Sequence, residues 1–401
     1  MHTSKIWGLG AEMAKLTGYK VSELGQIPQD WNVVELGDVL KIRHGKNQKE
    51  VENPNGTYPI LATGGQIGWA TEYLYDKPSV LIGRKGTIDK PRYQDTPFWT
   101  VDTLFYSEIG TSCSTKFIFY KFCLIDWIKN NEASGVPSQN AKTIEKIQIS
   151  LPPLPEQTAI ATALSDTDAL ISSLQTLIAK KQAIKLSAMQ NLLSGKIRLP
   201  EFAQRPDGSP KNTRQTELGC VPEDWEVVEL GSVAFIKTGS KNNQDKKENG
   251  QYPFFVRSAT VEQIDTYSYD CEAILIPGEG NIGSIFHYIN GKFDAHQRVY
   301  VIRDFYNVIG KFVFFALKQN FGKHAMENTV KATVDSLRLP TFQNFKFAIP
   351  KSTTEQTAIA QLLSDMDAEI EVLECRLKKT QALKQGMMQA LLTGKIRLPL
   401  E

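Results

Sequence analysis

The sequence predicts an α+β fold in which two copies of one α/β domain each continue into a long helix. The first observation behind this prediction is an internal repeat, because "SGKIRLP" at 194–200 recurs as "TGKIRLP" at 393–399 of the 401-residue chain. The second is a change within each copy from short β-branched runs to a regular helical pattern. Self-similarity of this kind indicates that one duplicated module organises the chain.

The repeat extends over most of the chain. With a shift of 199 residues, "EQTAIATALSDTDALISSL" from Glu156 aligns with "EQTAIAQLLSDMDAEIEVL" from Glu355, without a gap up to both "GKIRLP" endings. Earlier in the chain a shift of 194 aligns "IPQDWNVVELGDV" (27–39) with "VPEDWEVVELGSV" (221–233). Each copy is therefore a variable part followed by a well-matched tail, and the second variable part is five residues longer.

The variable parts have the composition of twisted sheet with exposed loops. Runs such as "SVLIGRKGTI" and "RVYVIRDF" are rich in β-branched residues and are bounded by Gly, Pro, Asn and Asp. One aromatic-rich stretch in each copy, at 116–129 and 311–321, is expected to be helical. We expect α/β domains at 21–153 and 214–351, which is an ordinary domain size. Two further segments are expected outside these domains and helices. They are an N-terminal tail, 1–20, and a linker between the two copies, 201–213.

The two well-matched tails are expected to form long helices. Apolar residues recur there in alternating steps of four and three, which is typical of a helix that packs against another helix. We expect helices within 154–200 and 352–401, each about 39 residues and about 58 Å long, ending near Gly195 and Gly394. Packing of each helix on its own domain is the alternative. The residues expected to pack between the helices are Ile160, Leu164, Ile171, Leu174, Ile178, Leu192, Ile359, Leu363, Met366, Ile370, Leu373, Leu377, Met387 and Leu391.

Composition limits the class of protein. An apolar content of 41% and a charged content of 22% are ordinary for a soluble globular protein. No apolar run approaches the roughly 20 residues that a membrane helix needs, and the first residues lack the order of a signal peptide, so we expect a cytoplasmic protein without membrane association. The five cysteines are scattered without a C-x-x-C pair, as expected for reduced thiols. A net charge of +2 does not by itself indicate a nucleic-acid partner.

The search for catalytic motifs favours a binding protein over an enzyme. The sequence contains no G-x-x-x-x-G-K-[ST] phosphate loop, no H-E-x-x-H motif and no cluster of metal ligands. "NPNG" at 53–56 shares only its first two letters with the N-P-P-aromatic motif of amino-methyltransferases. We therefore expect no catalytic residue, metal or cofactor in this chain.

Two basic loops follow equivalent strands of the two copies. Basic charge interleaved with Asn and Gln suits DNA, because Lys and Arg neutralise phosphates while Asn, Gln and Arg can form bidentate hydrogen bonds with purines. A solvated hairpin loop is the alternative, but two such loops on a duplicated frame favour DNA binding. The predicted DNA-binding residues of these loops are Lys41, Arg43, Lys46, Asn47 and Lys49 in the first copy, and Lys237, Lys241, Asn242, Asn243, Lys246 and Lys247 in the second.

A second pair of loops differs in charge between the copies. Arg84 and Lys85 follow an apolar run in the first copy and are added to the predicted DNA-binding residues, whereas Gly278 and Glu279 take their places in the second. If these loops face DNA, the two copies should not bind the same bases. The tryptophans of the two "DW" strings, Trp31 and Trp225, are expected to pack rather than bind a ligand.

These features together resemble the specificity subunit of Type I restriction-modification systems. The resemblance depends on the paired "EQTAIA" helix starts, on "LLSGKIRLP" and "LLTGKIRLP" closing the tails, and on "ELGQIPQDW" and "ELGCVPEDW" opening the variable parts. It covers nearly the whole chain beyond the first twenty residues.

The resemblance implies two target recognition domains, each binding one half of a split, asymmetric double-stranded DNA site, with the two helices as a spacer. It also implies two modification subunits, which bind S-adenosylmethionine and methylate adenine, and restriction subunits, which cleave DNA using ATP and Mg. If the first helix leads to the second domain, the second helix must return. The fold class is then two pseudo-two-fold-related α/β target recognition domains joined by two long antiparallel coiled-coil helices.

In this arrangement each "GKIRLP" string is a corner of the chain. We expect Lys196, Arg198, Lys395 and Arg397 to lie near the carbonyl-rich ends of their helices, where cations are favoured; contact with DNA is the alternative. Two other functions stay open: a specificity polypeptide of a Type IIB-like modification enzyme, and a non-DNA coiled-coil scaffold with duplicated interaction domains. Salt-dependent binding to duplex DNA would separate the scaffold from the other two.

Overall fold

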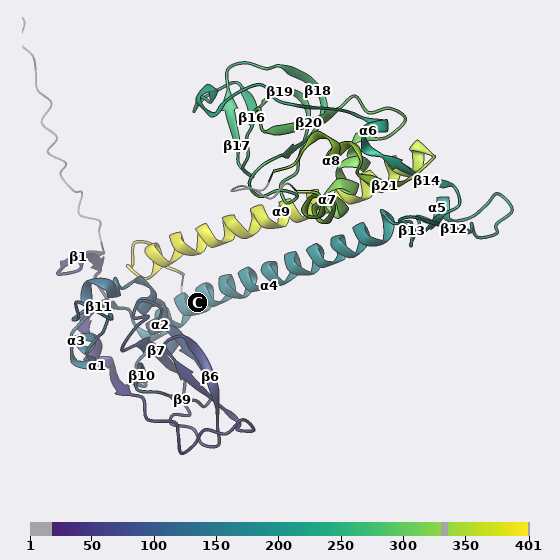
Figure 1. Ribbon diagram of the computed structural model, residues 1–401. Coiled ribbons are helices and arrows are strands. Elements are labelled where there is room, and N and C mark those ends of the chain that lie inside the picture. The colour runs from purple at the N-terminus through teal and green to yellow at the C-terminus, as the bar shows by residue number, and fades with distance from the viewer. Residues whose placement is uncertain (1–17, 330–335, 400–401) are drawn as a thin grey trace, which may run out of the picture. The chain divides into compact units, whose positions relative to one another are not determined.

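The computed structural model describes residues 18–329 and 336–399 (Figure 1). The chain separates into two compact units. The first unit contains the described residues up to Gln175 together with those from Arg376 onward, and the second unit runs from Thr176 to Cys375. Each unit therefore holds one variable part and a portion of both long helices.

The first unit is built from short strands with helices packed against them. Its elements in chain order are β1 (Tyr19–Ser22), β2 (Gly25–Pro28), β3 (Asn32–Glu35), α1 (Leu36–Val39), β4 (Leu40–His44), β5 (Tyr58–Ala62), β6 (Gly65–Ala70), β7 (Ser79–Gly83), β8 (Arg92–Gln94), β9 (Trp99–Thr100), β10 (Leu104–Ile109), α2 (Thr115–Leu124), η1 (Trp127–Asn130), α3 (Ala141–Glu145) and β11 (Gln148–Leu151).

The second unit follows a similar order. Its elements are α5 (Pro200–Ala203), β12 (Thr213–Thr216), β13 (Gly219–Pro222), β14 (Trp225–Glu229), α6 (Leu230–Val233), β15 (Phe235–Thr238), η2 (Asn243–Asp245), β16 (Tyr252–Phe255), β17 (Val261–Ile264), β18 (Tyr269–Pro277), β19 (His287–Ala295), β20 (Val299–Arg303), α7 (Gly310–Glu327), α8 (Leu339–Gln343) and β21 (Lys346–Pro350). Two segments assigned to tail and linker contribute structure, because β1 includes Tyr19 and Lys20 and β12 begins at Thr213; residues 1–17 lie outside the described residues.

The sheets of the two units differ at one strand. The first unit has strand orders β4-β10-β7-β8 and β6-β5-β9, whereas the second has one six-stranded sheet, β15-β20-β18-β19-β16-β17. The long strand β19 takes the places of β8 and β9, since β9 pairs in parallel with β5 and the end of β19 pairs in parallel with β16. Pro97 lies between β8 and β9, and proline cannot donate to a ladder. Residues 95–98, which include this proline, separate the two short strands.

In each variable part, a strand near the beginning pairs with the last strand. β3 pairs with β11, with Val34 opposite Ile149, and β14 pairs with β21, with Val228 opposite Phe347. Trp31 and Trp225 precede or begin these strands and are completely buried, so both tryptophans pack in the core as predicted.

The aromatic-rich stretches form helices with different bounds from those predicted. In the first unit α2 ends at Leu124, and the helix expected at 116–129 is interrupted before η1. At the interruption the Phe122 carbonyl accepts two hydrogen bonds, from the Ile125 N–H (3.3 Å) and from the Trp127 indole N–H (2.8 Å). In the second unit α7 continues to Glu327, six residues beyond the expected end at 321.

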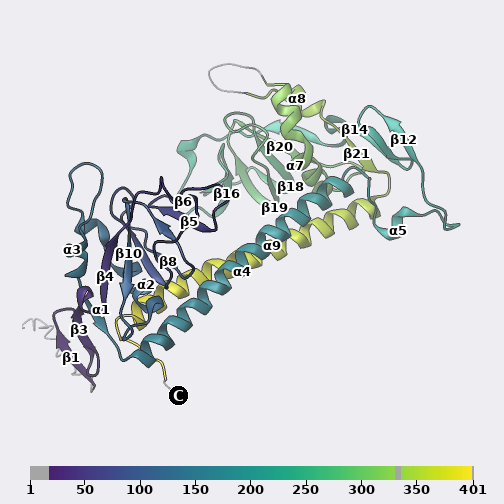
Figure 2. The same ribbon diagram turned by 90° about the horizontal axis from the view of Figure 1, so that it is seen from below.

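The two long helices are α4 (Leu154–Leu192) and α9 (Thr353–Leu391), each 39 residues long as predicted. They lie side by side in both views (Figures 1 and 2). In the first unit Asp168 pairs with Lys384 (2.6 Å), and in the second Lys181 pairs with Glu369 (2.7 Å). The residue numbers of the partners on α9 therefore decrease as those on α4 increase. The helices are antiparallel, and the predicted fold class is confirmed.

The residues predicted to pack between the helices are all buried or half-buried, and Thr380, which interrupts the apolar pattern, is buried as well. No helix in the described part of the chain combines the length and the apolar character that crossing a membrane requires.

Candidate nucleic-acid interface

One edge of the four-stranded sheet gathers several predicted DNA-binding residues of the first unit. β10 lies between β4 and β7 and is antiparallel to both, so the ends of β4 and β7 and the start of β10 lie together. The backbone N–H of Lys46 donates to Thr100 O (2.8 Å), and that of Arg84 donates to Thr103 O (2.8 Å). The basic loop after β4 and the Arg84 loop therefore meet on either side of residues 100–103.

A carboxylate holds the Arg84 side chain at this edge. Arg84 Nη1 lies 2.5 Å from Asp102 Oδ2 and also donates to Asp102 O (3.3 Å). The Arg84 side chain keeps 27% of its surface exposed. Because a guanidinium has five N–H donors, the contacts of Nη1 with Asp102 leave other donors available for another acceptor. Lys85 is exposed beside it.

The other predicted residues of the first unit are placed differently. Lys41 lies near the start of β4, and its ammonium donates to a carbonyl of α1 (3.0 Å). Arg43 pairs with Glu108 of β10 (2.8 Å). Asn47 and Lys49 are exposed in the loop after β4, where Asn47 Oδ1 accepts from the Lys49 N–H (3.1 Å). Lys41 is thus separated from the edge that the other residues approach.

Two aligned glycines allow the loops after β4 and β15 to approach the chain just before β10 and β20. A Cβ atom on Gly45 would lie 2.2 Å from Val101 O, and one on Gly239 would lie 2.1 Å from Ala295 O. Neither distance is compatible with a side chain, so the aligned glycines permit the same close approach in both units.

The second unit has an equivalent edge. The Gly278 N–H donates to Arg298 O (2.8 Å), which is the counterpart of the bond from Arg84 to Thr103, and the Gln297 N–H donates to Lys241 O (2.9 Å). The loops after β15 and β18 therefore meet the segment 296–298 that precedes β20.

Two arginines at this edge are not among the residues predicted from the sequence. Arg257 and Arg298 lie on either side of Glu279, with Nη1 atoms 3.5 Å and 3.1 Å from its carboxylate oxygens. Both arginine side chains are about half exposed. Neither belongs to a basic run in the sequence. The available signal was Glu279 itself, an acid in the place of Lys85 that requires a compensating cation.

The remaining predicted residues of the second unit are largely satisfied by neighbours. Lys241 Nζ lies 3.9 Å from the buried carboxylate of Asp294. Asn242 Oδ1 accepts from Gln297 Nε2 (2.6 Å). Lys246 pairs with an acid of β17 (3.4 Å). Lys237, Asn243 and Lys247 are exposed.

The ion pairs of the two edges take their cation and anion from opposite segments, and we call this arrangement an inverted ion pair. In the first unit the segment after β7 supplies the cation, Arg84, and the segment before β10 supplies the anion, Asp102. In the second unit the segment after β18 supplies the anion, Glu279, and the segment before β20 supplies the cation, Arg298. One backbone frame thus presents its guanidinium from different positions.

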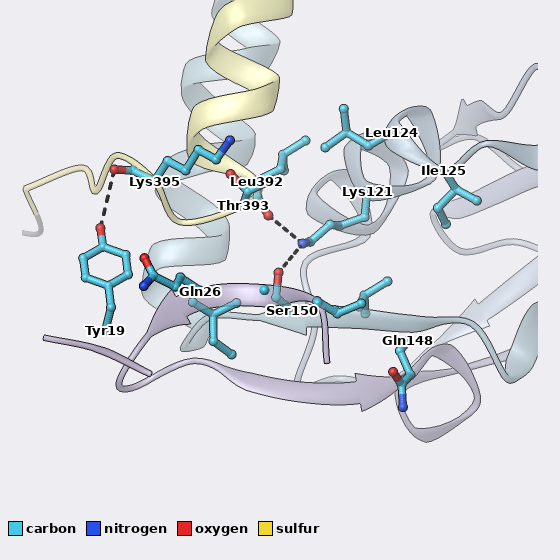
Figure 3. A pocket seen from close by; sticks show the side chains of 14 residues that line it. Tyr19, Gln26, Lys121, Leu124, Ile125, Gln148, Ser150, Leu392, Thr393 and Lys395 are labelled. Atoms are coloured by element: carbon cyan, nitrogen blue, oxygen red, sulfur yellow. Dashed lines mark hydrogen bonds between the residues drawn. The ribbon is translucent and has the colours of Figure 1, made fainter. Parts of the chain in front are cut away.

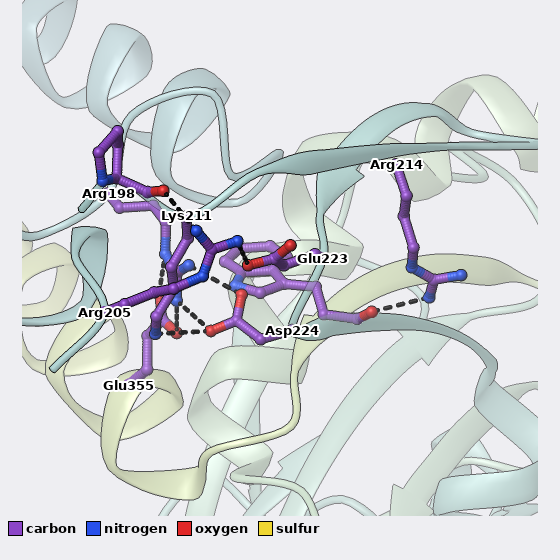
Figure 4. A network of polar contacts seen from close by, with 9 residues as sticks. Arg198, Arg205, Lys211, Arg214, Glu223, Asp224 and Glu355 are labelled. Carbon is purple, nitrogen blue, oxygen red and sulfur yellow. Dashed lines mark hydrogen bonds and ion pairs between the residues drawn. The ribbon is translucent and has the colours of Figure 1, made fainter. Parts of the chain in front are cut away.

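The repeated "EQ" and "GKIRLP" strings contact each other within each unit. In the second unit Arg198 donates from Nε to Glu355 (2.9 Å) and pairs with Asp224 (2.8 Å), as Figure 4 shows. The first unit has the same arrangement, in which Arg397 Nη2 lies 2.7 Å from Glu156 and 2.9 Å from Asp30.

These contacts correct the expectation for the arginines of the corners. Arg198 and Arg397 do not neutralise the carbonyls of their own helices; each reaches a glutamate in the first turn of the other long helix. The strings are nevertheless corners rather than free surface. Gly195 and Gly394 have φ angles of +68° and +74°, and a Cβ atom on either would lie 2.5 Å from a proline ring, so both turns require glycine.

The glutamines of the "EQ" strings tie each long helix to its domain. Gln157 donates to Pro152 O (2.9 Å) and accepts from the Ser114 N–H (2.9 Å), just before α2. Gln356 donates to Pro350 O (2.8 Å) and accepts from the Ile309 N–H (2.8 Å), just before α7. Both glutamines are buried.

A duplicated domain whose two copies are connected by a pair of long antiparallel helices defines the class of protein. Residues 28–185 and 222–381 each match the family described as the Type I restriction modification DNA specificity domain. The chain therefore belongs to this family as a specificity subunit with two target recognition domains.

Known relatives agree with this assignment. The Type I restriction enzyme EcoDI specificity subunit of Escherichia coli is 35% identical over 175 residues, which cover 44% of this chain and 38% of that protein. The MjaVIII specificity subunit of Methanocaldococcus jannaschii is 27% identical over 425 aligned positions, covering 93% and 94% of the two chains. The solved S subunit of M. genitalium has a TM-score of 0.68 at 16% identity and covers 90% of this chain and 96% of that one, so the two share a fold.

Proposed function

We propose that this chain is a non-catalytic subunit that recognises a bipartite, asymmetric DNA site and positions the enzymes that act there. The observation that supports this proposal most directly is the inverted ion pair. Arg84 with Asp102 and Arg298 with Glu279 occupy equivalent edges, yet the guanidinium comes from opposite segments. Two domains with one frame and different donor positions suit two different half-sites.

The two kinds of basic residue are proposed to have different tasks. A guanidinium held by a carboxylate keeps a fixed orientation, as bidentate recognition of guanine in the major groove requires. The exposed lysines of the loops, such as Lys46, Lys49 and Lys247, suit phosphate contacts, which position a protein but carry no sequence information. Arg84 and Arg298 are thus assigned to bases and these lysines to the backbone.

The partners proposed for the chain are those that the family implies. Two modification subunits, which bind S-adenosylmethionine, would methylate an adenine in each half-site, and restriction subunits with ATP and Mg would join them. The duplication of the chain supports two equivalent docking positions for the modification subunits.

Mapping methylated adenines across the genome of cells that carry this chain with its modification subunit tests the proposal. The expected result is one split motif with two different halves and a constant gap. Methylation without a split motif, or no methylation that depends on this chain, would contradict the proposed function.

A further inference from the structure

Each unit contains a pocket next to the point where a long helix ends. The first corner pocket, of about 670 Å³, is lined by Leu24, Ile27, Ile125, Ile149, Leu392 and Lys395 among others (Figure 3). The second corner pocket, of about 850 Å³, is lined at the corresponding positions by Leu218, Val221, Asn320, Phe347, Leu193 and Lys196. The repeat therefore duplicates a pocket as well as a fold.

A leucine that lines each pocket and an isoleucine next in sequence to a lining lysine are exposed to nearly the same extent in both units. Leu24 and Leu218 are 45% and 47% exposed, and Ile396 and Ile197, which follow the lining lysines, are 59% and 58% exposed. Single exposed apolar residues are normal on a protein surface. Here, however, a leucine and an isoleucine are exposed at equivalent positions of both copies, although the copies differ in many other surface residues. This repetition indicates a common cause.

The local fold does not require these leucines. Leu24 lies in the tight turn between β1 and β2, where its N–H donates to Ser22 Oγ (3.2 Å). Leu218 lies in the matching turn between β12 and β13, where its N–H donates to Thr216 Oγ1 (3.2 Å). In both bonds the leucine contributes only its backbone N–H, and such turn positions usually hold Gly, Asn, Asp or Ser. The leucine side chains are thus available for a partner.

The charge at the two pockets indicates what the partner brings. Lys395 and Lys196 are exposed at the rims, and no carboxylate of the described residues forms an ion pair with either ammonium. An apolar segment with an acidic residue beside it would cover the leucine and isoleucine and pair with the lysine.

We infer that the two corner pockets are equivalent docking sites for two copies of one partner, the modification subunit, through an apolar segment that carries an acidic residue. This inference rests on the proposed function, in which the same partner is bound twice. Duplicated pockets on one chain suit identical partners, whereas a single asymmetric partner would meet two different surfaces.

The test uses the full chain and the modification subunit with which it is co-expressed, with stoichiometry measured by native mass spectrometry. Leu24→Glu with Ile396→Glu alters the first corner, and Leu218→Glu with Ile197→Glu alters the second. Each double variant should bind one modification subunit instead of two, with affinity at the altered corner lowered at least ~10-fold. The variant altered at both corners should bind none. The four altered side chains and the two control positions given below are all exposed. Circular dichroism should therefore show an unchanged fold in every variant.

Matched controls place glutamate at exposed apolar positions away from the pockets. Val136→Glu in the first unit and Tyr306→Glu in the second, at positions 67% and 68% exposed, should leave two modification subunits bound. Loss of binding in these controls, or two subunits still bound to the variant altered at both corners, would overturn the inference. Association of the chain with itself that the corner variants abolish would overturn it too, because the pockets would then serve a second copy. Failure of the wild-type chain to bind any modification subunit would instead count against the proposed function.

Discussion

At the scale of single residues, Arg84 and Arg298 show how a duplicated frame can acquire two specificities. Each is held by one carboxylate at the same edge of its unit, but each comes from the segment that supplies the carboxylate in the other unit. The guanidinium thus comes from a different segment in each unit, while the equivalent backbone bonds from Arg84 to Thr103 and from Gly278 to Arg298 are kept.

We predict that Arg84→Ala relaxes the sequence requirement in one half-site and Arg298→Ala in the other. A bidentate arginine–guanine pair contributes roughly 1–3 kcal/mol of discrimination against the wrong base. Methylation mapping should therefore show one degenerate position in the affected half and none in the other. Lys247→Ala is the control; it should weaken binding and reduce its salt dependence while leaving both halves intact. Unchanged motifs in both arginine variants would assign these residues to structure alone.

Lys121 supplies a prediction about pH. Its ammonium is buried in the first unit, where Nζ donates to Leu392 O (2.6 Å) and Ser150 Oγ (2.8 Å), as Figure 3 shows. Burial lowers the pKa of Lys121 to about 7, whereas an unfolded lysine has a pKa of about 10.4. Between these values the unfolded chain binds the extra proton, so the free energy of unfolding should rise with pH from about 7 to about 10 and should not depend on this group below 7.

Replacing Lys121 with Met should remove this dependence. The difference in unfolding free energy between wild type and Lys121→Met should shift in favour of the wild type by up to ~4 kcal/mol between pH 7 and pH 10. The second unit has Ala316 at the equivalent position, so the fold accepts an apolar residue there. Denaturant unfolding at a series of pH values measures the difference, and a constant difference across that range would contradict the lowered pKa.

At the scale of elements, the ends of α4 and α9 are docked by matching ion pairs of unequal strength. The Arg198 and Glu355 side chains are 7% and 2% exposed, whereas Arg397 is 35% exposed. Glu156 has a second donor in the Trp31 indole N–H (3.0 Å). The indole N–H of Trp225, by contrast, has no acceptor among the described residues. The second corner therefore depends more on its arginine.

We predict that Arg198→Ala destabilises the second unit by roughly 3–5 kcal/mol, because it leaves a buried carboxylate without its partner. Arg397→Ala should destabilise the first unit by less. Hydrogen exchange of the first turns of α9 and α4 reports the two effects separately. The double variant Arg198→Met with Glu355→Gln serves as control and should recover part of the loss, since no buried charge remains. Equal effects of the two single variants would contradict this account.

The elements also show which features the sequence determines locally. The long helices were predicted to their length, because a regular apolar spacing repeated in two tails is a local signal. The break of α2 was not predicted, since it depends on the contact of Trp127 with Phe122. Arg257 and Arg298 were missed because their association with Glu279 depends on the order of strands in the sheet, with β20 between β15 and β18. Distant segments that meet only in the folded sheet leave no pattern in the sequence.

At the scale of the whole molecule, continuity of the long helices is the property that bears on the DNA site. Both α4 and α9 run without a break from one unit into the other, so any change of their length changes both connections between the recognition domains. If the helices act as a spacer, their length sets the gap between the half-sites, while the loops set the half-sites themselves.

We predict that inserting seven residues into both helices, after Gln175 and after Cys375, lengthens the gap in the DNA motif. Seven residues preserve the apolar spacing of the helix pair and add about 10.5 Å at 1.5 Å per residue. Since a base pair advances the duplex by about 3.4 Å, the gap should grow by about three base pairs with both half-sites unchanged. Insertion of seven residues into α4 alone is the control and should abolish methylation, because the two connections then differ in length. The readout is the genome-wide pattern of methylated adenines. An active variant with insertions in both helices that still methylated only the original spacing would mean that the gap is set by something other than helix length.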